Sequence, residues 1–361
     1  MFKKIKTLAA FFIVLIQCAV AQNVYTVNNT PGAPANYHTL QGAIDSVASG
    51  SILLLQASAL NYGIGVIRKP LVIYGAGYFP GQNSAPNTQA KLLESMVTLL
   101  QFLKGSQGCI VSGLSFRASP LDNGTISRLY FDSTSSITVS RSRIGATNCN
   151  CVSHNFCSVI QHSGSININQ CYIEAIDASM ILPAISSGIS FTNNIIVGTF
   201  NPVGGYNSGS FPFSYTFENN SFYGSFVSID FTNGSFVNNV IIQSPADPVY
   251  IGGSMTFADH NVSNVNIFPV GGTNIINADG PNTYTLYSNP AISSQDGIFQ
   301  LKAGSVAIGY GAGGIDCGAY GGKAYVLSGI PAIPNIYFAN LPPAGTTVGG
   351  LKVHLRIKAN N

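Results

Sequence analysis

The sequence predicts an all-β protein, a right-handed parallel β-helix solenoid with an N-terminal helical cap and a small C-terminal β segment. Three observations indicate it: a short repeated phrase, a period of twenty-odd residues, and a composition rich in Gly, Ser and Asn. Each phrase is an apolar residue, two or three polar residues and a second apolar residue. The phrases begin at Val111, Val139, Ile168, Phe191, Phe217, Phe236 and Phe257, at intervals of 28, 29, 23, 26, 19 and 21 residues.

The polar pair in each phrase predicts a bend between two strands. The apolar residues on either side then point into the coil, because side chains alternate along a strand. The second residue of each pair forms a column of Leu114, Ser142, Cys171, Asn194, Asn220, Asn239 and His260. Asparagine accepts left-handed backbone geometry and can hydrogen-bond to its copy in the next coil. We therefore expect a structural ladder of Asn194, Asn220 and Asn239.

The first 21 residues have the pattern of a secretory signal peptide. Three lysines precede the apolar run from Leu8 to Ile16, and small residues at Ala19 and Ala21 form a cleavage site before Gln22. No later apolar stretch is long enough to span a bilayer. We expect a protein that is secreted or held at the cell surface, with no transmembrane segment.

Charge excludes one class of partner. The chain has 16 Lys and Arg against 13 Asp and Glu, and the signal peptide holds three of the lysines, which leaves 13 of each sign. A balanced chain does not attract a polyanion, so nucleic acid is not expected as a partner. The hydrophobic share of 46% nevertheless predicts a packed core rather than disorder.

Six cysteines follow the signal peptide: Cys109, Cys149, Cys151, Cys157, Cys171 and Cys317. An even number in an exported chain favours disulfides. The group from Cys149 to Cys157, with His154, also offers metal-ligating residue types, but its spacing matches no standard zinc pattern. We predict disulfides and no metal site, with the alternative that Cys171 is only a small buried residue.

The N-terminal region predicts a cap for the open end of the solenoid. Leu40, Ala43, Ile44 and Val47 share one face of a helix at about 37–48, which Thr39 would cap. The runs Thr39-Leu-Gln, Ala43-Ile-Asp, Asn61-Tyr and Lys69-Pro-Leu-Val-Ile-Tyr-Gly resemble the opening of pectate-lyase-like right-handed parallel β-helix proteins. The resemblance implies a β-helix over residues 22–322. The segment 90–103 fits either a short helix or a coil with strands.

The C-terminal region divides at about residue 322. Residues 305–321 are similar to the end motif of bacterial secreted β-helix proteins of the choice-of-anchor type, except that Cys317 separates Asp316 from Gly318. The resemblance implies a bacterial exported protein. Residues 323–361 predict a β appendage, because Leu351 to Lys358 alternates cleanly between apolar and basic residues. We expect it to pack on the final coil, with surface retention as the alternative.

Catalytic candidates were sought by the chemistry that the resemblance implies. Lyases of this fold hold calcium with carboxylates and use Arg or Lys as base, whereas its hydrolases use clustered aspartates. The candidates lie where pre-phrase strands end: Arg128, Asp132, His162 and Asp230. Asp132 and Asp230 are several coils apart at about 4.8 Å per coil, which is too far for a carboxylate pair.

A ligand-binding candidate follows from the alternation after each bend. Arg117, Arg143, Tyr172, Glu174 and Tyr223 should share the outer face of one sheet. Arginine and tyrosine suit a sugar through stacking and hydrogen bonds. The alternative is a solvated face in which Arg143 and Glu174 form a weak ion pair.

These observations favour a glycan-binding or structural β-helix protein with no evident catalytic constellation and no cofactor. The alternative is a polysaccharide lyase or glycoside hydrolase of the pectate-lyase-like fold, and calcium would be needed only if it is a lyase. A third possibility is adhesion through flat faces rich in Asn, Ser and Thr. The expected partner is a polysaccharide or cell-surface glycan.

Overall fold

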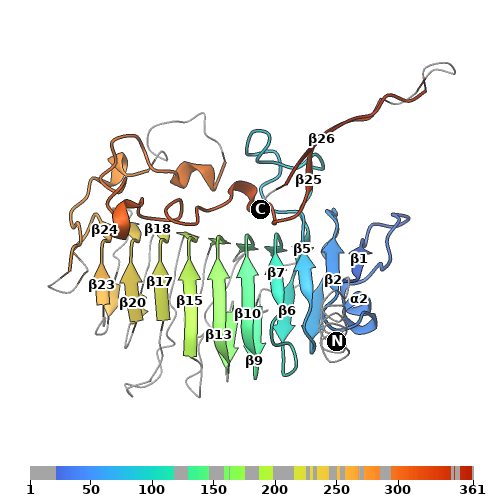
Figure 1. Cartoon of the computed structure of the whole chain (residues 1–361), viewed down its shortest axis with the longest axis horizontal. Coiled ribbons are helices and arrows are strands. Elements are labelled where there is room, and N and C mark those ends of the chain that lie inside the picture. Colours follow the sequence, from blue (N-terminus) through green and yellow to red (C-terminus); the bar gives the residue numbers. More distant parts are fainter. Residues whose placement is uncertain are drawn as a thin grey trace, which may run out of the picture.

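Parallel strands stacked side by side run along the whole molecule in the computed structural model (Figure 1). The structure describes residues 22–117, 129–145, 158–161, 163–174, 187–197, 215–224, 228–230, 234–243, 250–252, 257–266, 268, 272–284, 294–342, 345 and 350–359. The predicted signal peptide, Arg128, Cys149, Cys151, Cys157 and His162 lie outside the described residues.

Strands of successive coils stack into three sides, and in the described residues the first two sides hold more strands than the third. The first side is a ten-stranded sheet in the order β1 (Val24–Val27), β2 (Ile52–Leu55), β4 (Val72–Tyr74), β7 (Ile110–Ser112), β10 (Ser135–Ser140), β13 (Gly164–Asn169), β15 (Ser187–Thr192), β17 (Tyr215–Glu218), β20 (Gly234–Val237) and β23 (Phe257–Asp259). The second is an eight-stranded sheet of β5 (Met96–Val97), β8 (Ser115–Phe116), β11 (Arg143–Ile144), β14 (Tyr172–Ile173), β16 (Ile195–Val197), β18 (Ser221–Gly224), β21 (Val240–Gln243) and β24 (Val262–Ser263). The third comprises β3 (Ile64–Ile67), β6 (Leu99–Phe102), β9 (Leu129–Asp132) and β12 (Ser158–Gln161), followed by the pair β19 (Ser228–Asp230) and β22 (Tyr250–Gly252).

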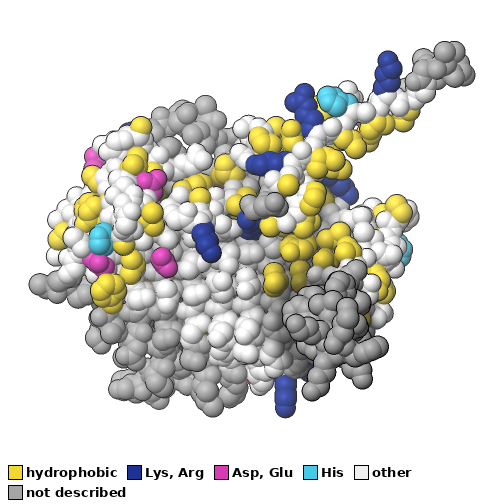
Figure 2. All heavy atoms as spheres, viewed as in Figure 1, with side chains coloured by type: hydrophobic (Ala, Val, Ile, Leu, Met, Phe, Trp, Pro, Cys, Tyr) yellow, Lys and Arg dark blue, Asp and Glu magenta, His cyan; other side chains and the backbone are white. Residues whose placement is uncertain are grey.

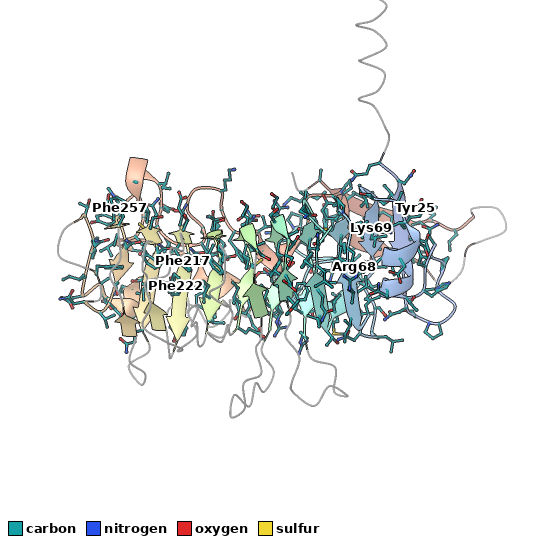
Figure 3. The ribbon with its side chains drawn as sticks, turned by 90° about the horizontal axis from the view of Figure 1, so that it is seen from below. Tyr25, Arg68, Lys69, Phe217, Phe222 and Phe257 are labelled. Atoms are coloured by element: carbon teal, nitrogen blue, oxygen red, sulfur yellow. The ribbon has the colours of Figure 1, made fainter. Side chains whose placement is uncertain are left out.

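These three sides form a right-handed parallel β-helix, as the sequence predicts. Segment 90–103 contributes β5 and β6 and contains no helix. The apolar residues that begin and end the first six phrases point inward and are at most 1% exposed. Because the strands are in register, equivalent side chains of neighbouring coils stack on each other. Phe191 and Phe217 pair in this way, with ring centroids 4.9 Å apart. Figure 3 shows Phe217 and Phe222 within the coils.

The last phrase is shifted by one residue from the prediction. Phe236 pairs with Ala258 rather than Phe257, and Phe257 is 53% exposed at the C-terminal end of the solenoid (Figure 3). A shift of one residue exchanges inward and outward positions along a strand. The column residue of this coil is therefore Asn261, and the prediction of His260 was wrong.

The predicted asparagine ladder is present and longer than expected. Each side-chain Nδ2 donates to Oδ1 of the next Asn, at 2.9 Å from Asn194 to Asn220 and 3.0 Å from Asn220 to Asn239. The ladder continues to Asn261 at 3.1 Å and to Asn274 at 2.9 Å. The same Oδ1 atoms accept the backbone N–H of the preceding Asn, as between Asn220 and Asn194 at 3.0 Å. The ladder therefore satisfies buried backbone donors at the bend, where no strand pairing is available.

Left-handed backbone geometry belongs to the residue before each ladder position, contrary to our prediction. Positive φ angles occur at Gly113, Arg141, Gln170, Asn193, Asn219, Asn238 and His260, between 45° and 76°. This residue turns the chain, and its successor points inward.

The N-terminal end is closed by a helix, α2 (Leu40–Ser46), with Thr39 as its N-cap as predicted. Gln41 completes the cap by binding the edge strand β3. Its Oε1 accepts the backbone N–H of Val66 at 2.8 Å, and its Nε2 donates to the carbonyl of Val66 at 3.3 Å. The side-chain amide thus replaces the strand that would otherwise pair there, which protects the edge from another chain.

The chain after the last coil returns along the solenoid and covers the eight-stranded sheet (Figure 1). We call residues 294–330 the strap. The strap contains the short 3-10 helices η5 (Gly297–Phe299), η6 (Ala312–Gly314) and η7 (Leu327–Gly329), and η3 (Gly280–Asn282) precedes it. A second hydrophobic core, which includes Tyr172, Ile195 and Val240 from the sheet and Phe299 and Tyr325 from the strap, fills the space between them.

Outward bend residues hold the strap in place. The N–H of Ala312 in the strap donates to the side-chain Oδ1 of Asn238 at 2.8 Å. Asn193 donates through its side-chain Nδ2 to the carbonyl of Ala319 at 3.1 Å. Arg141 donates through Nη1 to the carbonyl of Ile330 at 3.1 Å. Gln170 Nε2 donates in the same way to the carbonyls of Lys323 and Ala324. The two polar residues of a phrase therefore have separate structural roles.

The C-terminal strand β26 (His354–Lys358) pairs antiparallel with β25 (Asn335–Asn340). The prediction that this appendage packs on the final coil was wrong. Its base bonds to the segment near residue 90 instead, where the N–H of Ala90 donates to the carbonyl of Ile336 at 2.9 Å. The reason is that the strap carries the chain back toward the N-terminal coils (Figure 1).

The described cysteines, Cys109, Cys171 and Cys317, are free and buried, so the prediction of disulfides at these three was wrong. Burial raises the pKa of Cys171 to about 12 and that of Cys109 to about 11, so both remain as inert thiols. Each fills a small apolar space, as the alternative reading of Cys171 expected. In the described part of the chain, no helix is long and apolar enough to cross a membrane.

Candidate functional site

The predicted sugar-binding residues meet on the eight-stranded sheet, but the chain covers most of them. Arg143 pairs in register with Tyr172, as the alternation predicts. Tyr172 is only 6% exposed and lies edge-on to Phe79, with ring centroids 4.9 Å apart. The guanidinium of Arg143 lies 4.7 Å from the Phe79 ring centroid, and Tyr223 contacts Phe299 of the strap. A ligand would have to displace both the strap and the segment with Phe79 to reach this face.

The charges beside this face neutralise each other. Arg143 donates through Nε and Nη2 to Glu174 Oε1, with an Nε–Oε1 distance of 3.0 Å. Glu94, from the segment before β5, lies 3.9 Å from both Arg143 and Arg117. The sequence suggested a weak, solvated ion pair of Arg143 and Glu174, whereas the structure shows a cluster of four charged residues that also includes Glu94 and Arg117. The cluster fixes the segment with Phe79 and Glu94 against the sheet. Its most exposed member is Arg117, with 38% of the side chain open to solvent, against 20% for Glu174.

A buried acid lies where the strap meets that segment. Asp296 is fully buried and accepts hydrogen bonds from Asn83 Nδ2 at 2.8 Å and from the Ser328 N–H at 2.6 Å. Burial raises its pKa above the ordinary value. Tyr78 and Tyr325, whose hydroxyl groups bond to each other, lie beside it, and burial raises both pKa values well above the ordinary range. With no exposure to solvent, this cluster holds two segments together and does not meet a substrate.

The structure tests the position of only one catalytic candidate in full. Asp132 ends β9, is partly exposed, accepts a hydrogen bond from Ser133 at 2.9 Å and pairs in register with Gln161. Asp230 ends β19, in a different sheet, and its side chain is outside the described residues, like Arg128 and His162. Among the described residues no three His, Cys, Asp or Glu side chains form a metal-binding group.

Asp259 and His260 form a turn at the last coil. His260 Nδ1 lies 2.9 Å from Asp259 Oδ2, and Thr273 donates its N–H and hydroxyl to Asp259 Oδ1 at 2.7 and 2.6 Å. The hydrogen bonds from Thr273, followed by the contact with His260, lower the pKa of Asp259 to about 2. This set holds residues 272–275 against the coil.

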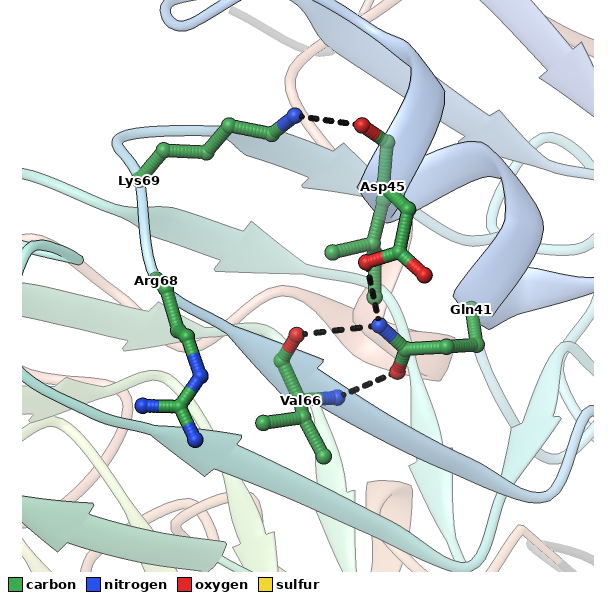
Figure 4. Close-up of a pocket in the computed structure, with 6 residues that line it drawn as sticks. Gln41, Asp45, Val66, Arg68 and Lys69 are labelled. Carbon is green, nitrogen blue, oxygen red and sulfur yellow. Dashed lines mark hydrogen bonds between the residues drawn. The ribbon is translucent and has the colours of Figure 1, made fainter.

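A small pocket lies beside the cap helix (Figure 4). Gln41, Ile44, Asp45, Val66, Arg68 and Lys69 line its volume of about 190 Å³. Lys69 Nζ donates to the carbonyls of Asp45 and Val47 at the end of the helix, where a cation is favourable. Because ligand pockets usually measure about 300–1,000 Å³, we assign these residues to the cap.

The outer face of the ten-stranded sheet is the remaining broad surface. Its middle strands carry two rows of hydroxyl and amide side chains in register, all partly exposed: Thr138, Asn167, Ser190, Thr216 and Ser235 in one row, and Ser140, Asn169 and Thr192 in the other. Figure 2 shows this middle region without charged or hydrophobic colour. Ile110 and Phe257 continue the first row at its two ends. The sequence predicted flat polar faces, but strand pairing was needed to identify these residues.

No protein-family model and no curated protein matches the chain. Among solved structures, the chain is similar to the pectate lyase Pel9A, with 14% identity over 83% of this chain and 97% of that chain and a TM-score of 0.34. It is also similar to an alginate lyase from Paenibacillus sp. str. FPU-7, with 13% identity over 66% of this chain and 96% of that chain and a TM-score of 0.21. At these identities the likeness concerns the fold alone.

Proposed function

We propose that this protein binds an extended, uncharged polysaccharide along the outer face of the ten-stranded sheet and does not cleave it. The observation that carries the proposal is the pair of rows of Ser, Thr and Asn side chains, one across β10, β13, β15, β17 and β20 and the other across β10, β13 and β15. Hydroxyl and amide groups both donate and accept hydrogen bonds, as sugar hydroxyls do.

The spacing of the rows fits a linear repeating ligand. Neighbouring strands lie about 4.8 Å apart, and residues two apart on one strand lie about 6.8 Å apart. An extended glycan along the solenoid axis would meet an equivalent polar group at every coil. Tyr74 and Phe257, at opposite ends of the two rows, offer rings on which a sugar can stack.

Location supports the same reading. Residues 1–21 have the pattern of a secretory signal peptide, and export would bring the polar face to extracellular or cell-surface glycans. The resemblance of residues 305–321 to choice-of-anchor proteins favours a bacterial surface. Glu218 and Asp259, near the C-terminal end of the face, would repel an acidic polymer, which favours a neutral one.

The test is incubation of residues 22–361 with neutral and acidic polysaccharides, with calcium present or chelated, while retention, reducing ends and unsaturated products are measured. We expect retention on a neutral polysaccharide, with no product and no effect of chelation or salt. Calcium-dependent unsaturated products would instead establish a lyase, and new reducing ends alone a hydrolase. Neither retention nor turnover would overturn the proposal in favour of a purely structural protein.

A further inference from the structure

The C-terminal hairpin β25–β26 concentrates exposed apolar side chains more than any other part of the chain that the structure describes. Sixteen large hydrophobic residues of the described chain are exposed, and seven lie in or beside this hairpin: Ile336, Phe338, Leu341, Leu351, Val353, Leu355 and Ile357. The hairpin projects from the body near the N-terminal coils (Figures 1 and 2). An isolated two-stranded hairpin is only marginally stable in water, so a cover for its apolar side would stabilise it.

The two faces of the hairpin differ in chemistry. Ile336 pairs with Ile357, and after a bulge Ala339 pairs with Leu355, so these four residues share an apolar face. The bulge places Phe338 opposite Arg356 on the other face. There the Arg356 guanidinium lies 5.2 Å from the Phe338 ring centroid, and the His354 ring lies 5.4 Å from it. The hairpin is therefore amphipathic, with an apolar face and a basic face.

The charged residues of the hairpin itself all have one sign. Lys352, Arg356 and Lys358 lie within its second half, and the sequence has no Asp or Glu after Asp316. Figure 2 shows basic side chains along this projection. An amphipathic basic element is attracted to anionic lipid headgroups and buries its apolar face at the boundary with the acyl chains.

A second copy of the chain is a poorer cover. Pairing of β26 with itself across a two-fold axis would bring His354, Arg356 and Lys358 of both copies together along one face. Like charges opposite each other disfavour strand pairing, and lysine on an edge strand is a common protection against it.

We propose that the β25–β26 hairpin is a membrane-docking element that binds the surface of an anionic phospholipid bilayer. Leu355, Ile357 and Val353 enter the interface, while the long side chains of Lys352, Arg356 and Lys358 stay at the level of the headgroups. The hairpin thereby holds the solenoid at a membrane surface. This inference is independent of glycan binding, because the hairpin lies outside the ten-stranded sheet.

The test is flotation of residues 22–361, which contain both hydrophobic cores, with vesicles of phosphatidylcholine alone or mixed with phosphatidylglycerol. We expect binding only to the mixed vesicles, and weaker binding as salt is raised. L355S/I357S should abolish it, and K352Q/R356Q/K358Q should lower the partition coefficient on the order of a hundredfold.

Matched controls make the result specific. V306S/I308S changes two residues of similar exposure, also two apart, in the strap, and R68Q/K104Q/K323Q removes three exposed charges elsewhere. Both controls should bind like the wild type, and circular dichroism should show every variant folded. The proposal fails if the protein binds neither vesicle, binds both equally, or loses binding as much in a control. It also fails if L355S/I357S converts a dimer to a monomer in sedimentation without changing vesicle binding.

Discussion

At the scale of single residues, the bend of each coil separates two roles of asparagine. Asn220 points inward and bonds to the next and previous rungs of the ladder, whereas Asn193 and Asn238 point outward and bond to the strap. The sequence predicted the ladder because three consecutive asparagines share one column. It could not predict the second role, because the partners lie about 70 to 130 residues away in a segment without a repeat.

Removal of one rung tests the ladder. In Asn220→Ala, the N–H of Asn194 loses its acceptor, and the Nδ2 of Asn194 keeps only the Ile168 carbonyl. The Phe191 carbonyl loses a donor, and Asn239 Oδ1 keeps only the backbone N–H of residue 220. Buried groups left without partners cost about 1–3 kcal/mol each, so we expect a loss of about 3 kcal/mol in the free energy of unfolding. Urea unfolding measures it. Asn167→Ala, on the partly exposed outer face, should change it by less than about 0.5 kcal/mol; equal losses would contradict the ladder's role.

Two aspartates predict opposite pH dependences. The pKa of Asp296 is raised in the folded state, so the folded state binds the extra proton. The wild type should therefore gain stability relative to D296N as pH falls through the raised pKa toward the ordinary value of 3.8, and stay level below it. Asp259 has a lowered pKa, so the wild type should lose stability relative to D259N as pH falls from 3.8 to about 2.

Urea midpoints of the three proteins across this pH range give the answer. Parallel curves for the wild type and D296N would show that the pKa of Asp296 is the same in the folded and unfolded states. That result would contradict the raised pKa that follows from its burial. Parallel curves for the wild type and D259N would remove the assigned role of Thr273 in holding that carboxylate.

At the scale of elements, the strap decides what the eight-stranded sheet can do. Sequence alternation placed Arg143, Tyr172 and Glu174 on an outer face correctly, but an outer face of a sheet is not necessarily exposed. The strap has the glycines that a close approach requires: a Cβ on Gly318 would lie 2.8 Å from Ser221 Oγ, and one on Gly321 would collide with the Asp316 carbonyl. In the sequence these glycines predicted only tight turns. They gave no indication that the strap covers the eight-stranded sheet.

Truncation of one buried aromatic side chain of the strap should unfold the strap locally while the solenoid stays folded. Phe299 is 2% exposed and its ring meets those of Tyr284 at 5.6 Å and Tyr223 at 5.7 Å. Phe299→Ala should cost about 3–5 kcal/mol and raise hydrogen exchange in residues 294–330, while the strands β13 and β15 stay protected. Phe217→Ala, in the solenoid core, should instead raise exchange in those strands. Unchanged exchange in the strap of Phe299→Ala would show that other contacts hold it.

At the scale of the whole molecule, the fold was predictable because every repeat has the same pattern of inward apolar residues and bend residues. Inward apolar residues, the ladder and the cap helix each follow from local patterns. The burial of the predicted ligand site could not be predicted from the sequence, because the exposure of that site depends on contacts between distant segments. The last phrase failed for a related reason: Phe257 matches the aromatic residues of the earlier phrases, but the Asn239–Asn261 hydrogen bond sets the register.

The central claim is that the ten-stranded face binds the glycan, and affinity electrophoresis in a gel that contains the retained polysaccharide tests it most directly. N167A/S190A/T216A removes three polar groups of one row. Q101A/D132N removes one polar side chain and one charge from the four-stranded sheet, the charge being that of the catalytic candidate that the structure describes. At about 0.5–1.5 kcal/mol per hydrogen bond, the first variant should bind at least about tenfold more weakly. The second should bind like the wild type. Equal affinity of the row variant and the wild type, with both folded, would contradict the account.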